Sequence, residues 1–160
     1  MASNVLTEGI LTIAVVIAAS AVVAVFVQGS NQLNMVQSMV LQDAKETAST
    51  SITIVFAAQS SEREVKVWVK NTGRAQIDAA QIQRFDIFFG KVPSPALILY
   101  NGTYDRWDFE IVNDLDRDGR LDQGETLEIT VAVSWSIGTG DYVVRVNTHN
   151  GVGDTYYFSL

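Results

Sequence analysis

The densest group of potential ligands in the chain is an acidic loop at residues 114–125, DLDRDGRLDQGE. Counted from its first residue, carboxylates fall at positions 1, 3, 5, 9 and 12, and a glycine falls at position 6. This spacing is typical of a twelve-residue calcium loop, in which oxygen ligands surround a hard cation and the seventh residue offers its backbone carbonyl. The alternative is an acidic turn whose charges are solvated. The pattern predicts a structural Ca²⁺ held by Asp114, Asp116, Asp118, Arg120, Asp122 and Glu125.

The chain offers little else that could do chemistry. It has no cysteine and a single histidine, His149, which excludes thiolate metal sites, cysteine nucleophiles and histidine-rich centres. No Ser/His/Asp order, phosphate loop or paired-carboxylate cleft stands out, so we expect no enzyme and interpret His149 as a turn residue. A net charge of −7 argues against nucleic acid as a partner, because binding phosphates needs a surplus of basic residues.

One short motif suggests a modification. Asn101-Gly-Thr103 is an acceptor pattern for N-glycosylation, in an expected turn between two strands. The motif predicts a glycan on Asn101, and the alternative is an ordinary Asn-Gly turn.

The composition changes near residue 45, because all 11 basic residues lie from Lys45 onward. The run Ile10–Val27 is apolar apart from Thr12 and Ser20. As a helix this run would measure ~27 Å, close to the ~30 Å hydrocarbon core of a bilayer. The run predicts a membrane-spanning or filament-core helix, with a buried core helix or a cleavable signal as alternatives.

The helical pattern continues beyond the apolar run, with Leu33, Val36 and Val40 forming a narrow apolar stripe. We therefore expect one helix from about residue 5 to about 48, able to bend at Gly29 and Ser30. It would either pack as a stalk on its own domain or assemble with copies of itself. Small residues on one face favour assembly, because they let helices approach closely. The carboxylate of Glu8 would either stabilise the start of the helix through the helix dipole or form a salt link with the α-amino group of a neighbouring subunit. The predicted assembly residues are Glu8, Ala14, Ala18, Ala21 and Val25.

From residue 51 the hydrophobic period changes from 3.6 to 2. Eight strand-like runs are separated by turn residues, with only AQIDAAQI resembling a short helix. The pattern predicts two domains: a helix at residues 1–48, and an all-β, immunoglobulin-like sandwich of about seven to eight strands at residues 49–160.

Two segments carry a family resemblance: SNVLTEGILTIAVVIAASAVVAVF at the N-terminus and VWVKNTGRAQI in the β domain. Together with the helix-plus-sandwich architecture, they resemble the archaeal type IV pilin-like proteins, first the archaellum accessory protein G family and next the F family. The resemblance implies a static, stator-like part of the archaellum motor. Implied partners are copies of the chain, archaellum protein F, the S-layer protein and membrane lipid.

The resemblance also implies a location: a single pass through the archaeal membrane with the β domain in the pseudoperiplasm. The sequon and the calcium-type loop favour this domain outside and the N-terminus in the cytoplasm. Two other functions stay open. One is a filament subunit, an archaellin or adhesive pilin, although no basic residue precedes Gly9 as in their leaders. The other is a membrane-tethered module that binds glycan or S-layer through Trp107, Tyr100 and Tyr104.

Overall fold

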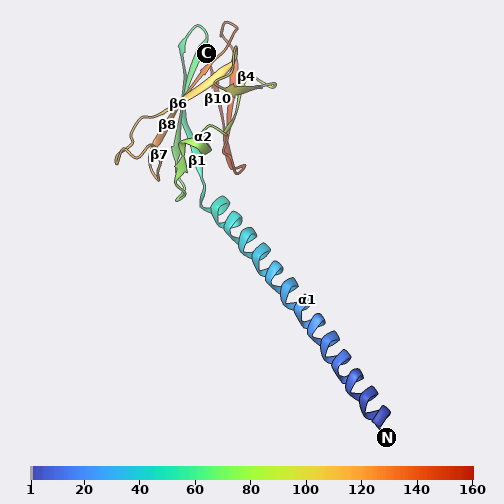
Figure 1. Cartoon of the computed structure of the whole chain (residues 1–160). Coiled ribbons are helices and arrows are strands. Elements are labelled where there is room, and N and C mark those ends of the chain that lie inside the picture. The colour runs from blue at the N-terminus through green and yellow to red at the C-terminus, as the bar shows by residue number, and fades with distance from the viewer. Residues whose placement is uncertain (1) are drawn as a thin grey trace. The chain divides into compact units, whose positions relative to one another are not determined.

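The computed structural model of the chain describes the backbone of residues 2–160 and the side chains from residue 7 onward (Figure 1). It divides into two compact units, Met1–Ala44 and Lys45–Leu160. The predicted boundary lay between residues 48 and 49, about one helical turn later. The last helical turn belongs to the second unit because the carbonyl of Ser49 accepts hydrogen bonds from the N–H groups of Arg74 (2.8 Å) and Ala75 (3.1 Å).

The first element is a single helix, α1 (Ala2–Ser49), which runs through Gly29 and Ser30 without interruption. The hydroxyls of its apolar run bond back to the helix itself: Thr12 Oγ1 to the carbonyl of Glu8, and Ser20 Oγ to that of Val16, both at 2.8 Å. Its most apolar 18-residue window has a mean hydropathy of 2.9 and is not buried within the described structure. By length and composition this helix is able to cross a membrane.

All eight predicted strand runs form strands of one mixed sheet, in the order β1-β2-β8-β6-β5-β4-β9-β10. Every neighbouring pair is antiparallel except β5 and β6. A ribbon of β3 (Ile77–Asp78) and β7 (Arg120–Leu121) and a short helix, α2 (Ala79–Ile82), complete the domain. The sheet strands are β1 (Ile52–Ser61), β2 (Glu64–Asn71), β4 (Asp86–Lys91), β5 (Ala96–Tyr100), β6 (Arg106–Ile111), β8 (Thr126–Ala132), β9 (Asp141–Asn147) and β10 (Gly153–Ser159).

The alternation of side chains places one face of this sheet in the core. In β2 the valines at 65, 67 and 69 are fully buried, while the residues between them reach the outer face. The sheet folds over itself into a nearly closed sandwich, as predicted. Its first and last strands meet where Asp154 Oδ2 accepts the N–H of Ile54 at 2.8 Å.

The strand registers give the β domain two ends. The chain enters at the end where Ile52 pairs with Asn71 and where Lys70 pairs with Thr126; we call this the entry end. The opposite end carries the β1–β2 turn, the β4–β5 turn, the β8–β9 connection and the C-terminus (Figure 1). We call it the far end.

Candidate functional site

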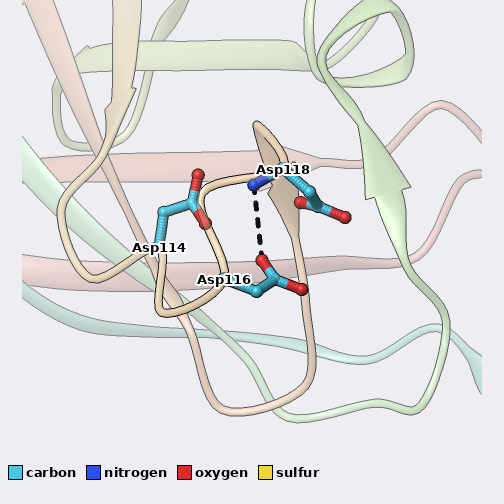
Figure 2. A group of neighbouring side chains, drawn as sticks. All are labelled: Asp114, Asp116 and Asp118. Carbon is cyan, nitrogen blue, oxygen red and sulfur yellow. Dashed lines mark hydrogen bonds between the residues drawn. The ribbon is translucent and has the colours of Figure 1, made fainter.

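The acidic loop connects β6 to β8 at the entry end. Asp114, Asp116 and Asp118 each direct a carboxylate oxygen to a common point, and these oxygens lie within 4.8 Å of one another (Figure 2). Oxygen ligands bind Ca²⁺ at 2.3–2.6 Å, so two ligands of one ion are at most ~5 Å apart. The spacing of the three carboxylates therefore fits a shared calcium ion, and the structure brings together three of the six predicted ligands.

Asp114 organises this turn through its two carboxylate oxygens. They accept the N–H groups of Arg117 at 2.6 Å and of Gly119 at 3.0 Å. The turn takes Arg117 to φ 60° and Gly119 to φ 74°, the left-handed region that glycine adopts at low cost. Gly119 therefore suits the sharp turn, as the calcium-loop pattern predicts.

The environment of Asp116 raises the pKa of its carboxyl above the ordinary value. Loss of solvation raises the pKa of this carboxyl, the negative charges of Asp118 and Asp122 add to the rise, and the N–H of Asp118 opposes it. A bound cation would favour the charged form of the same carboxyl, because it would compensate both the lost hydration and the like charges.

Two other predicted ligands, Glu125 and Asp122, are not part of this group of three carboxylates. Glu125 is 3% exposed, and its two carboxylate oxygens accept the N–H groups of Leu115 (3.0 Å) and Asp122 (2.9 Å). The buried carboxylate of Glu125 thus stabilises the loop through these two hydrogen bonds. Asp122 Oδ2 accepts Gln76 Nε2 at 3.0 Å, whereas its Oδ1 is buried without a hydrogen bond from the described residues. Ligation by Glu125 and Asp122 stays a prediction.

Arg120 contributes a charged side chain near the cluster. Its Nε lies 3.0 Å from Asp78 Oδ1 and 3.8 Å from Asp118 Oδ2. The guanidinium therefore neutralises part of the charge that the three aspartates carry. The predicted role of the Arg120 carbonyl as a ligand also stays a prediction.

Asn71 joins the loop to the point where the chain enters the β domain. This fully buried side chain donates to the carbonyls of Ala75 (2.8 Å) and Leu121 (2.9 Å) and accepts the N–H of Gly73 at 3.0 Å. Its backbone exchanges two further bonds with the loop, from its N–H to the carbonyl of Glu125 and from the N–H of Gly124 to its carbonyl. No local pattern in the sequence indicates this role of Asn71, because its partners lie up to 50 residues away.

A second group of contacts fixes the last turn of α1 on the same end. Glu46 Oε1 lies 3.1 Å from His149 Nε2, and Asn150 Nδ2 donates to Thr50 Oγ1 at 2.8 Å. Gln81 Nε2 lies 3.3 Å from the same ring nitrogen of His149. His149 was interpreted as a turn residue, and no feature of the sequence pairs it with Glu46, 103 positions earlier.

The predicted assembly residues are accessible. Every described side chain from residue 7 to residue 28 is exposed, including the small-residue face, and Val25 is 70% exposed. An apolar surface of this size in water is unfavourable, which favours its burial in lipid or against other helices. The predicted assembly residues among these exposed side chains are Glu8, Ala14, Ala18, Ala21 and Val25.

The two predicted glycan-related features differ in outcome. Asn101 is exposed at a turn with φ 49°, so its side chain is accessible for modification, and glycosylation stays a prediction.

The prediction that Trp107, Tyr100 and Tyr104 form a glycan-binding surface is wrong for Trp107. This side chain is only 1% exposed and packs on Tyr100 with ring centroids 4.9 Å apart. Only Tyr104 of that group is largely exposed, at 80%.

Comparison with known proteins supports the architecture. A protein of Archaeoglobus fulgidus described as uncharacterized is 30% identical over 99% of both chains. The archaellum periplasmic stator protein FlaG from Sulfolobus acidocaldarius has the same fold, with a TM-score of 0.59 and 22% identity, covering 68% of this chain and 99% of that one.

The structure of the FlaF and FlaG stator complex from the same organism matches with a TM-score of 0.57 and 22% identity, covering 67% of this chain and 87% of that one. These matches confirm the predicted likeness to archaellum accessory protein G. The archaeal-type flagellin family matches residues 2–158, nearly the whole length. The chain therefore belongs to the archaeal-type flagellin family.

Proposed function

We propose that this chain is a static, stator-like component of the archaellum motor, and that its role is mechanical and not catalytic. The observation that carries the proposal is the fold of the β domain, which is that of the FlaG stator protein over 99% of that chain. In the present chain this domain is joined to an exposed apolar helix. A membrane anchor and an extracellular domain are the two parts that a stator requires.

The helix supplies the anchor and the contacts between copies. Residues 10–27 would cross the archaeal membrane once, with the N-terminus in the cytoplasm and the β domain in the pseudoperiplasm. The face formed by Ala14, Ala18 and Ala21 allows close approach of a second helix, and many such contacts together resist torque. The β domain would then contact archaellum protein F, which the FlaF and FlaG complex supports, and the S-layer.

We further propose that the acidic loop binds a structural Ca²⁺ through Asp114, Asp116 and Asp118. The loop is held to the entry end by Asn71 and Glu125. An ion that rigidifies the loop would therefore stiffen the part of the domain that continues into α1. Its role would be to maintain this junction under load.

A filament subunit is the second candidate, because the family is that of archaeal-type flagellins. The two functions differ in whether the N-terminal segment is removed. Mass spectrometry of the native protein distinguishes them: a mature chain that starts at Ile10 supports the filament subunit, and one that retains Ala2 supports the anchored component.

Self-assembly through the helix is tested with two neighbouring alanines. Ala18 lies on the small-residue face, whereas Ala19 is about 100° further round the helix. We expect the full chain to form oligomers that negative-stain imaging detects after detergent removal. Ala18→Phe should prevent these oligomers, and Ala19→Phe should leave them intact. Monomers in the unmodified protein, or equal effects of the two substitutions, would refute the proposed interface.

A further inference from the structure

The far end of the β domain contains a cleft of about 350 Å³, remote from the acidic loop. Its base is formed by Phe89 and Ile98, which are 1% and 2% exposed. Trp135, from the β8–β9 connection, forms one wall. Cavities of roughly 300–1,000 Å³ accommodate small ligands, and a few polar groups on an apolar base are typical of them.

Trp135 is held in a fixed orientation and remains accessible. Its ring is parallel to those of Phe89 (8° between planes, centroids 5.9 Å apart) and Tyr142 (7°, 6.3 Å). These contacts determine the direction of the indole plane, while 36% of Trp135 is exposed. A ring immobilised in this way loses little conformational freedom when a flat ligand stacks on it.

The polar groups around the cleft include both donors and acceptors. Asp105 Oδ1 accepts the N–H of Ser134 at 2.6 Å, which positions the carboxylate and leaves its second oxygen without a hydrogen bond from the described residues. Lys91 Nζ donates to the carbonyl of Thr139 at 3.2 Å and has two further protons available. Ser94 and Ser136 add hydroxyl groups.

The formal charges of the lining residues balance, because one aspartate, Asp105, and one lysine, Lys91, are among them. A strongly charged ligand would gain from one of them and be repelled by the other. A neutral ligand that can both donate and accept hydrogen bonds suits this pair better. It also needs an apolar face for the indole of Trp135.

We propose that this cleft binds a neutral pyranose unit of an extracellular glycan, stacked on Trp135 and hydrogen-bonded by Asp105 and Lys91. A pyranose presents C–H groups on one face and hydroxyl groups around its edge, which corresponds to the apolar wall and the polar rim. The far end is the part of the domain most distant along the strands from the chain entry at Thr50. Sugar binding there is independent of assembly through α1, so either proposal can fail alone.

The test uses the full chain in lipid nanodiscs, since detergents with sugar headgroups would compete for the cleft. Saturation-transfer NMR is recorded with a panel of neutral methyl pyranosides at millimolar concentration. We expect transfer to at least one of them, with protons of its apolar face receiving most. Absence of transfer to every pyranoside would overturn the proposal.

Variants identify the site. Trp135→Ala should abolish the transfer, and Asp105→Asn should weaken the affinity about tenfold, which corresponds to ~1.4 kcal/mol. Trp68→Phe is the matched control, because Trp68 stacks on Phe56 elsewhere on the sheet. Ser94→Trp fills the cleft from an exposed turn without removing a packed ring, and therefore tests the site even if Trp135→Ala unfolds. Transfer that persists in both Trp135→Ala and Ser94→Trp, or that is lost in Trp68→Phe, would contradict the assignment.

Discussion

Substitution of Asn71 by alanine tests whether the entry end depends on one buried amide. The change removes three hydrogen bonds and leaves the N–H of Gly73 and the carbonyls of Ala75 and Leu121 without their partner. Gly73 and Leu121 are buried and Ala75 is partly accessible to water. With ~1.5 kcal/mol for each of the two buried groups and a few tenths for the third, we expect a loss of about 3 kcal/mol.

The assay is urea or thermal unfolding of the full chain in nanodiscs, followed by tryptophan fluorescence. All three tryptophans, Trp68, Trp107 and Trp135, lie in the β domain, so the emission reports on that domain alone. At ~4 °C per kcal/mol for a domain of this size, the melting temperature should fall by about 12 °C. Since the loop packs on Asn71, the loss should appear as one cooperative transition at lower temperature.

Two further variants isolate the cause. Asn71→Asp keeps the shape and the acceptor for Gly73, but its carboxylate faces the two carbonyls that the amide bonded, so it should destabilise at least as much as alanine. Gln123→Ala removes an exposed amide from the same loop and should change the free energy of unfolding by less than ~0.5 kcal/mol. The reasoning is refuted if Asn71→Ala costs under about 1 kcal/mol, or no more than Gln123→Ala.

Two other predictions concern the same end of the domain. Gly73→Ala should destabilise the domain strongly in the same unfolding assay, because a Cβ there would overlap the backbone of Ser49 and Ser51. Gly138→Ala is the control and should be near neutral, because a Cβ there meets nothing within 4 Å. Similar losses of stability for both variants would contradict this prediction. Millimolar Ca²⁺ should raise the melting temperature of the full chain, and Asp116→Asn combined with Asp118→Asn should remove that rise; an undiminished rise in the double variant would show that the ion binds elsewhere.

Local periodicity made most of the fold predictable. The apolar run at Ile10–Val27 indicated the helix, and alternating runs such as EVKVWVKN gave all eight strands of the sheet. The alternation of apolar and polar residues in β6 also indicates that Trp107 is buried. Trp107 and Phe109 lie on one face of the strand, and the charged Asp108 and Glu110 lie on the other. The prediction of Trp107 as a surface platform did not use this pattern.

The candidate sites depended on contacts that periodicity does not encode. The spacing of Asp114, Asp116 and Asp118 indicated their convergence, since one short turn brings them together. The same spacing suggested Glu125 as a ligand, which stays a prediction. The spacing does not encode that both carboxylate oxygens of Glu125 accept N–H groups of the loop.

By itself, the sequence determined which segments are helical, which are extended and where the acidic turn lies, because each of these depends on residues within a few positions of one another. Only the tertiary structure decided that Asn71 supports the loop, that His149 meets Glu46 and that Trp135 forms the wall of a cleft. Those contacts join residues distant in the chain, and their geometry follows from the register and order of the strands, which are fixed by the packing of the whole core.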